Sequence, residues 1–154
     1  MKDTRVRLAQ SPDCEALARL RAALWPESSA EEHARELALM LAGEFPGVMP
    51  LVILVAQTGD GRLVGFLEVG LRSYADGCSQ SYPVGYVEGW YVAENRRRQG
   101  IGAELLRAAE DWARGQRCIE MASDTAIGNA VSQRAHEALG FEVVERSVVY
   151  RKAL

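Results

Sequence analysis

Residues 92–103, Val-Ala-Glu-Asn-Arg-Arg-Arg-Gln-Gly-Ile-Gly-Ala, combine glycines and basic residues in a pattern suited to binding an anion. Gly100 and Gly102 have no side chains, so a ligand can approach the backbone closely. The N–H groups in the first turn of a following helix lack acceptors within the helix and can donate to an anion. Arg96, Arg97 and Arg98 add positive charge. The pattern predicts a cradle for a pyrophosphate group.

Other interpretations of this segment compete with the pyrophosphate cradle. A solvated basic turn before an amphipathic helix is the better interpretation of Gly-x-Gly alone, but the order strand, arginines, glycines and helix favours the phosphate site. A Walker A loop is excluded because no Gly-Lys-Ser/Thr follows. A Rossmann fingerprint fits poorly because the unit lies late in the chain and lacks the third glycine.

Arg97-x-x-Gly100-x-Gly102 after a strand resembles the acyl-CoA pyrophosphate motif of the GNAT superfamily of N-acyltransferases. Asn129, followed by His-Glu-Ala-Leu-Gly-Phe at 136–141, resembles that superfamily's second cofactor motif. A closer resemblance is to the bacterial aminoglycoside 6′-N-acetyltransferases, in the branch usually found as dimers. It rests on dispersed motifs: Leu24-Trp25-Pro26, Ser73-Tyr74 with Gly77-Cys78, Val87-Glu88-Gly89, Glu120-Met-Ala-Ser-Asp124, and Glu145-Arg146 with Tyr150-Arg151.

The resemblance implies direct transfer of the acetyl group of acetyl-CoA to the 6′-amine of an aminoglycoside, conferring resistance, in a homodimer without a metal. Asp124 or Glu88, with Asp124 preferred, would accept the proton of the amine, and backbone N–H groups near residues 90–92 would polarise the thioester carbonyl. Carried over by position, the cofactor contacts are Trp90, Tyr91, Val92, Arg98, Gln99, Gly100, Ile101, Gly102, Ala103 and Asn129, and the acceptor contacts are Trp25, Tyr74, Glu88, Asp124 and Glu145.

A site for a polycationic aminoglycoside is expected to gather carboxylates, but each candidate also has a structural interpretation. Glu88 lies in an apolar strand, where the alternative is an outward-facing residue. Asp124 ends a strand and could instead cap the helix that follows. Glu145 lies in the last expected strand, where a cross-strand ion pair with an arginine explains it equally well.

The aromatic and histidine candidates have similar alternatives. Trp25 is by its type more often a core residue than a ligand contact, although its place before Pro26 suits contact with a sugar. Tyr74 offers a hydroxyl or simply packs in its loop. His136 takes the place of the superfamily's frequent tyrosine, a proposed acid for the departing thiolate, and is expected to be a satisfied helix residue instead. His33 is expected on the surface of the second helix.

Hydrophobic periodicity, caps and turn residues predict the elements that position these side chains. Helices are expected over residues 11–25, 29–43, 100–114 and 129–139, the second with a capping box of Ser29 and Glu32. Strands are expected over residues 51–57, 62–72, 84–92, 119–123 and 141–151, with a hairpin turn at 58–61 and an irregular loop at 73–83. This order predicts one α/β (α+β) domain over residues 1–154, with a mixed, mostly antiparallel sheet flanked by helices.

Composition and charge narrow the classes of function. The chain has 154 residues, of which 48% are hydrophobic and 25% are charged, as in ordinary globular domains. Its net charge of −3 disfavours a nucleic-acid-binding role. Three cysteines without CxxC spacing indicate reduced thiols, and the first residues lack the pattern of a signal peptide, so a cytoplasmic location is expected.

The expected strand at 141–151 is long and rich in β-branched residues, so a monomer would leave an open sheet edge. Pairing or exchange of this strand with a second copy would cover the edge in a two-fold dimer. Against this, the alternating charges of Glu142, Glu145, Arg146, Arg151 and Lys152 could protect a monomer. Two other functions stay open: an N-acetyltransferase acting on a polyamine or another small amine, and a non-catalytic acyl-CoA-binding module.

Overall fold

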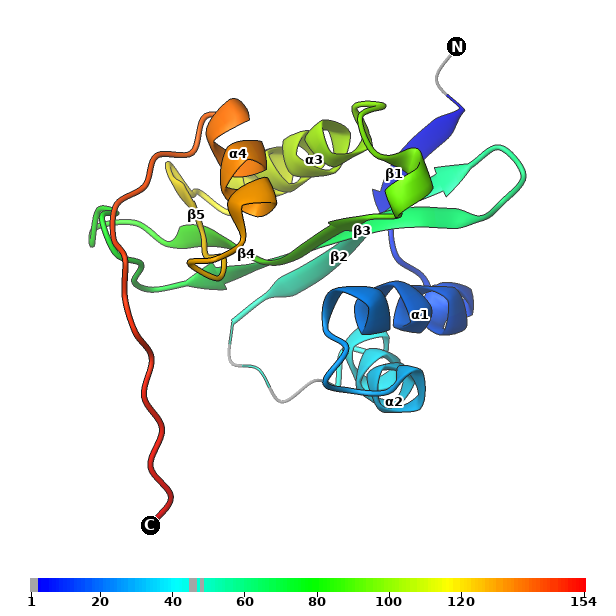
Figure 1. Cartoon of the computed structure of the whole chain (residues 1–154), viewed down its shortest axis with the longest axis horizontal. Coiled ribbons are helices and arrows are strands. Elements are labelled where there is room, and N and C mark those ends of the chain that lie inside the picture. The colour runs from blue at the N-terminus through cyan, green and yellow to red at the C-terminus, as the bar shows by residue number, and fades with distance from the viewer. Residues whose placement is uncertain (1–2, 45–46, 48) are drawn as a thin grey trace.

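The computed structural model describes residues 3–44, 47 and 49–154 and arranges them as a sheet between two layers of helices (Figure 1). The strands are β1 (Thr4–Leu8), β2 (Leu51–Thr58), β3 (Leu63–Arg72), β4 (Val84–Val92) and β5 (Met121–Ser123). The helices are α1 (Cys14–Leu24), α2 (Ala30–Leu41), α3 (Ile101–Gly115) and α4 (Ala130–Ala138), with 3₁₀ turns at Ser11–Asp13 and Glu94–Arg96. None of the described helices is long and apolar enough to cross a membrane.

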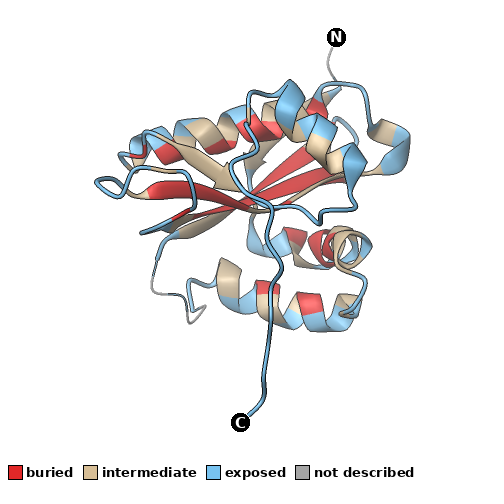
Figure 2. Cartoon of the chain, turned by 60° about the vertical axis from the view of Figure 1, so that its left-hand side comes forward, coloured by how far each residue is buried: buried red, intermediate tan, exposed pale blue. Residues whose placement is uncertain are grey.

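The strands lie in the order β1-β2-β3-β4-β5, and every neighbouring pair is antiparallel except β4 and β5, which are parallel. Helices α1 and α2 cover one face of the sheet, while α3 and α4 lie on the other (Figures 1 and 2). This arrangement confirms the predicted mixed, mostly antiparallel sheet flanked by helices.

Each face of the sheet has its own apolar core. On one face Leu17 of α1 and Leu37 of α2 pack with Phe66 of β3, and all three are fully buried. On the other face Leu105 of α3 packs against Leu67 of β3. Burying one such side chain contributes about 1.5–3 kcal/mol. Figure 2 shows the buried central strands between the helix layers.

The helix boundaries follow the predicted signals in most places. Ser29 Oγ accepts the Glu32 backbone N–H at 3.2 Å, and the Glu32 carboxylate accepts the Ser29 backbone N–H at 2.7 Å, which confirms the capping box. Helix α1 ends before Pro26, as predicted. Its predicted start at residue 11 is wrong, because residues 11–13 form a 3₁₀ turn in which the Asp13 carboxylate accepts the Gln10 N–H.

Two elements at the ends of the chain differ from the prediction. Strand β1 was not predicted; it pairs with β2 from Thr4↔Thr58 to Leu8↔Leu54. The predicted strand at 141–151 is wrong for the single chain, because residues 141–154 find no strand to pair with. A strand needs a neighbour to accept and donate its backbone hydrogen bonds. Phe141 instead packs on the core of the α3 face and Val144 lies against Gly77, and the chain beyond them runs extended away from the body (Figure 1).

A buried ion pair joins α1 to the sheet. Arg21 and Glu68 are 5% and 3% exposed, and Arg21 Nε lies 2.7 Å from Glu68 Oε1. Arg21 also pairs with Glu36 of α2 at 2.7 Å, so one guanidinium links both helices to β3. Burial raises the pKa of Glu68 to about 7, even though the charge of Arg21 opposes the shift. The cost of burying the carboxylate therefore outweighs its attraction to Arg21.

This pKa predicts a pH-dependent stability. The unfolded carboxyl titrates near 4.5 and the folded one near 7, so the stability that Glu68 contributes is complete below pH 4.5 and is lost as pH rises towards 7. In the parent protein we expect the free energy of unfolding to fall with rising pH in this window, by a slope that approaches about 1 kcal/mol per pH unit. We expect this contribution to be absent in Glu68→Gln, because glutamine does not titrate. Urea unfolding between pH 4.5 and 7.5 measures it, with Glu15→Gln, which removes an exposed carboxylate paired with Arg19, as the control. Parallel curves for the parent and Glu68→Gln would contradict the prediction.

Candidate functional site

Strands β4 and β5 part halfway along β4. Their parallel pairing covers only Gly85↔Met121, Tyr86↔Ala122 and Val87↔Ser123, whereas β4 continues to Val92. On its other edge β4 carries a bulge, because Glu68 pairs with Gly89 and Val69 with Val87, which leaves Glu88 as the extra residue. From residue 88 onward, β4 therefore has no β5 partner. Its unpaired edge borders the opening between the two strands.

The glycine loop before α3 has the conformation of an anion cradle. Gly100 has φ +81° and stands at the N-cap of α3, and Arg98 has φ +60°. The first helical hydrogen bond here runs from Glu104 N to Gly100 O at 3.1 Å. The N–H groups of residues 101–103 therefore precede the hydrogen-bond ladder of the helix and are oriented as donors for a ligand.

Gly102 was expected to leave its backbone open to a ligand, but it has a packing role instead. A Cβ added at Gly102 would meet the Trp90 ring at 3.3–3.5 Å, whereas nothing lies within 4 Å of one added at Gly100. Gly102 thus lets α3 pack closely on Trp90, and Gly100 is required for its left-handed backbone.

The three arginines of the loop are not equivalent. Arg97 Nε donates to the Val92 carbonyl at 2.9 Å, and its guanidinium lies 5.6 Å from the Tyr91 ring. Arg96 lies 3.9 Å from Asp3. Arg98 is exposed and makes no hydrogen bond or ion pair with any other residue that the structure describes. Of the three, Arg98 has the side chain that is available to an anion at the start of α3.

A charged cluster lies beside the point where β4 and β5 part. Arg72, at the end of β3, donates from Nε and Nη2 to the two oxygens of Glu88 at 3.0 and 2.8 Å. Its guanidinium carbon lies 3.4 Å from the centroid of the Tyr86 ring. Burial raises the pKa of Tyr86, and the negative charge of Asp124 raises it further; the charge of Asp124 also acts on Arg72, beside that of Glu88. The structure thus brings the predicted Glu88 and Asp124 together.

The structure rules out the capping alternative for Asp124 and shows that Glu88 has an ion-pair partner. The Glu88 side chain is 32% exposed and paired with Arg72, so it is not a freely solvated strand residue. Asp124 does not cap α4, because Asn129 is the N-cap and its Oδ1 accepts the Ser132 N–H at 3.1 Å. The predicted cofactor contact at Asn129 stays a prediction, and its side-chain oxygen serves the cap.

Trp25 borders the same face of β4. A Cβ added at Gly89 would lie 2.4 Å from the Trp25 ring, so the ring lies directly on the β4 backbone. Trp25 also meets Phe66 edge-on at 6.0 Å between centroids. The surface position expected for His33 is wrong: His33 is buried, and its Nε2 lies 3.1 Å from the Trp25 carbonyl oxygen. Helix α2 thereby helps to fix the position of Trp25.

His136 is satisfied by hydrogen bonds, as predicted. Its Nδ1 lies 2.7 Å from the Ser132 carbonyl oxygen and its Nε2 lies 2.8 Å from Ser123 Oγ. Because a carbonyl only accepts, Nδ1 carries the proton of a neutral ring, and Nε2 accepts from the Ser123 hydroxyl. The ring lies 5.3 Å edge-on from Trp90, which joins α4 to β4 where the strands part.

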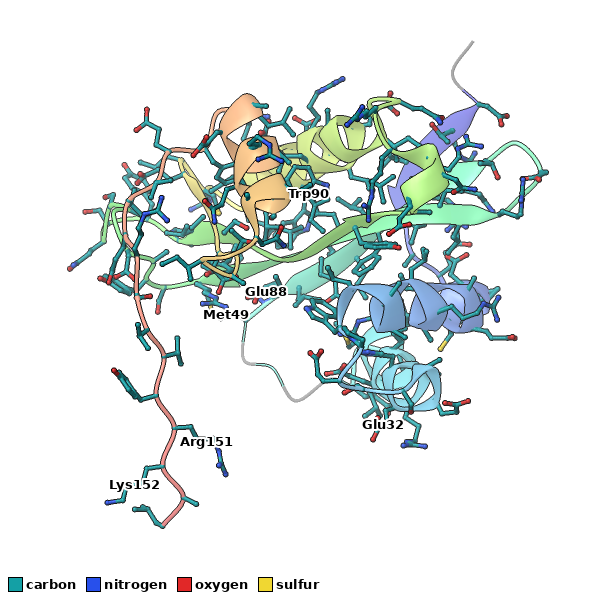
Figure 3. The ribbon with its side chains drawn as sticks, viewed as in Figure 1. Glu32, Met49, Glu88, Trp90, Arg151 and Lys152 are labelled. Carbon is teal, nitrogen blue, oxygen red and sulfur yellow. The ribbon has the colours of Figure 1, made fainter. Side chains whose placement is uncertain are left out.

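Neither Tyr74 nor Glu145 makes a hydrogen bond or ion pair with Arg72, Glu88 or Asp124. The Tyr74 hydroxyl donates to Asp76 at 2.8 Å, and this bond, with the charge of Asp76, raises the pKa of Tyr74. Glu145 lies in the extended segment and forms no ion pair with any residue that the structure describes. Its charge also raises the pKa of Tyr74, so the two side chains are neighbours. The Arg151 and Lys152 side chains lie far from Glu88 and Trp90 of β4 (Figure 3).

Sequence reasoning missed Arg72 and Tyr86. Both occupy ordinary strand positions, and only the register of β3 against β4 shows that the Arg72 side chain passes over Tyr86 to reach Glu88. Within residues 3–44, 47 and 49–154, no group of three histidine, cysteine or acidic side chains is arranged to hold a metal ion.

Comparisons with known proteins agree with this geometry. Residues 14–141 match the model of the acetyltransferase (GNAT) family. The chain is 42% identical over 149 residues to an aminoglycoside N(6′)-acetyltransferase type 1 of Klebsiella aerogenes, covering 97% of this chain and 96% of that one. It is 47% identical over 136 residues to the enzyme of the same name from Serratia marcescens, covering 88% and 89%.

Two solved structures are similar over nearly their whole length. The structure of AAC(6′)-Iy in complex with the bisubstrate analog CoA-S-monomethyl-acetylneamine has a TM-score of 0.87 and 33% identity, covering 99% of this chain and 100% of that one. The aminoglycoside 6′-N-acetyltransferase AAC(6′)-Ih from Acinetobacter baumannii has a TM-score of 0.85 and 29% identity, covering 98% and 99%.

The close contact between Gly89 and Trp25 allows a test of the position of the Trp25 ring on β4. We expect Gly89→Ala to displace the Trp25 ring, because the new methyl would overlap it, and to destabilise the fold by about 1–3 kcal/mol. Intrinsic fluorescence and urea unfolding measure both effects. Gly115→Ala is the control, since nothing lies within 4 Å of a Cβ there. If Gly89→Ala behaved like Gly115→Ala, Trp25 would not lie on β4.

Proposed function

Because the chain belongs to the GNAT family of acetyltransferases, we propose that it transfers the acetyl group of acetyl-CoA to the 6′-amine of aminoglycoside antibiotics and thereby confers resistance. The observation that carries the proposal is the opening between β4 and β5. It has an anion cradle on the α3 side and a carboxylate cluster beside the bulge. We further propose that residues 1–154 form one such domain and that it works in the cytoplasm, where its three free cysteines stay reduced.

The α3 side of the opening fits the cofactor. A pyrophosphate would accept from the N–H groups of residues 101–103 and pair with Arg98, the exposed arginine of the loop. The thioester end would then lie along residues 90–92 of β4, whose outer edge has no β5 strand against it. Backbone N–H groups there would donate to the thioester oxygen as negative charge develops on it. Gln99 and Asn129 are further proposed contacts.

The carboxylate cluster fits a polycationic acceptor. Glu88 and Asp124 lie close together beside the bulge of β4, where an ammonium group would approach, and the Trp25 ring lies against the neighbouring Gly89. The neutral amine would attack the thioester carbonyl carbon, the carbon–sulfur bond would break, and CoA would leave as the thiolate. Asp124 or Glu88 would take the amine proton, directly or through water. Holding both reactants in the opening supplies much of the acceleration.

Release of free CoA thiol from acetyl-CoA across a panel of amines tests the proposal. We expect kanamycin and tobramycin to be acetylated, with the 6′-amine as the site found by mass spectrometry. Release with polyamines alone would replace the aminoglycoside by another acceptor. Tight CoA binding with no release for any amine would favour a non-catalytic module.

Asp124 has a testable part in the chemistry. We expect Asp124→Asn to lower kcat on kanamycin by about 100-fold or more, because a general base contributes 10²–10⁴-fold, while the KM for acetyl-CoA changes by less than about twofold. Asp111→Asn on α3, which removes an exposed carboxylate paired with Arg114, is the control. An undiminished kcat in Asp124→Asn would leave Asp124 a binding role at most.

We propose that the protein is a homodimer in which the extended C-terminal segment pairs with a second copy. The segment exposes a row of apolar side chains, with 64% of Val144, 72% of Val148, 91% of Val149 and 89% of Tyr150 accessible. Such a β-branched stretch without a strand partner is suited to joining another sheet. In such a dimer Glu145 would lie near the acceptor site, together with Tyr74.

Light scattering at micromolar concentration tests this proposal. We expect a mass near twice the 16.9 kDa of one chain, and a mass near that of one chain would contradict the dimer. Deleting residues 143–154 is expected to abolish both the dimer and the activity, because it removes the pairing segment and Glu145 together.

A further inference from the structure

Arg72 makes a bidentate contact with Glu88, the carboxylate that is proposed to receive a cationic group of the substrate. Both oxygens of Glu88 are engaged, at 3.0 and 2.8 Å. A guanidinium fork that matches a carboxylate in this way occupies the positions where an incoming ammonium group would donate its own hydrogen bonds. A cationic acceptor must therefore share Glu88 with Arg72 or displace it.

The surroundings of Arg72 make displacement feasible. Its side chain is 45% exposed and that of Glu88 is 32% exposed, so the pair is screened by water and is weakly held. The Tyr86 ring, 3.4 Å from the guanidinium carbon, provides a face over which the group can move without losing all its contacts. The charge of Asp124 acts on both Arg72 and Tyr86, so Asp124 lies close by and offers the displaced guanidinium a second carboxylate.

The net charge of Glu88, Asp124 and Arg72 determines which cations gain by binding there. Without Arg72, Glu88 and Asp124 would present two negative charges to any cation. With Arg72, the cluster presents one. A monoamine then gains little by entering, whereas an acceptor that carries several ammonium groups can neutralise both carboxylates and compensate for the lost guanidinium contact.

We propose that Arg72 holds Glu88 in the free enzyme as an internal substitute for the acceptor's ammonium group, and that its displacement selects for multiply charged acceptors. The proposal rests on the proposed function, since it concerns the binding of a polycation at that site. It makes Arg72 a specificity residue that acts through Glu88, with no part in the transfer of the acetyl group.

Calorimetric binding of kanamycin in the presence of CoA tests the proposal, with Arg72→Gln compared with the parent protein. We expect the Kd of kanamycin to fall about 3- to 10-fold in Arg72→Gln and the Kd of a monoamine, glucosamine, to fall by a larger factor, because competition for Glu88 is removed. In turnover, the KM for kanamycin falls while kcat stays within about twofold. Arg72→Lys keeps the positive charge but loses the bidentate contact. Its Kd for kanamycin is expected to lie between those of the parent protein and Arg72→Gln.

Two further variants make the result specific. Arg62→Gln removes one positive charge at the other end of β3, where Arg62 pairs with Asp60, and is expected to leave the Kd of kanamycin unchanged. In Glu88→Gln the effect of Arg72→Gln is expected to disappear, because the competition acts through that carboxylate.

The outcomes separate this proposal from the proposed function. An unchanged or weaker affinity for kanamycin in Arg72→Gln, with turnover retained in the parent protein, overturns the role of Arg72 alone. Binding without turnover in the parent protein overturns the proposed reaction and leaves the binding comparison to decide on Arg72. Absence of kanamycin binding to both proteins overturns both proposals.

Discussion

The parting of β4 from β5 after Val87 is the constraint on which the other features of the site depend. A central strand normally satisfies its backbone groups on both edges, yet β4 runs on to Val92 without a β5 partner. The bulge at Glu88 lies where the pairing ends, and a bulge turns the strand and re-aims its side chains. The end of the β5 pairing therefore exposes backbone groups to a ligand, and the bulge on the opposite edge places a carboxylate beside them.

The other parts of the fold hold this opening in place. Trp90 is clamped between Gly102 of α3 and His136 of α4, which positions the start of α3 against the free stretch of β4. On the opposite face Trp25 lies on Gly89, and the buried pair of Arg21 and Glu68 anchors the helix that carries it. Trp90, on the α3 side of the opening, therefore packs on one apolar core, and Trp25, on the α1 side, packs on the other.

Local signals predicted most elements because each was marked by residues with a direct physical role. Ser29 and Glu32 cap a helix through their own side chains, and Gly100 is required by its left-handed backbone. What depended on pairing across the chain was not predictable. Strand β1 is short and polar and is recognisable only through its register with β2. The segment at 141–151 has the composition of a strand and lacks a partner within one chain.

The site shows the same division. Glu88 and Asp124 could be proposed from the sequence because the family resemblance marks both positions and a carboxylate among apolar strand residues is conspicuous, and the structure brings them together. Arg72 and Tyr86 could not, since only the register of β3 against β4 places a guanidinium over that ring and against Glu88. The buried position of His33 likewise depends on the return of α2 against Trp25, which no local pattern encodes.

Amide hydrogen exchange with and without CoA tests most directly whether the opening between β4 and β5 is the ligand site. Ligand binding is expected to slow exchange in residues 88–92 of β4 and in residues 98–103 before and within α3, because these N–H groups acquire acceptors. Exchange in β1 and β2, which lie at the other edge of the sheet, is expected to stay unchanged. Slowed exchange confined to β1 and β2, or none in 88–92 and 98–103, would contradict the account.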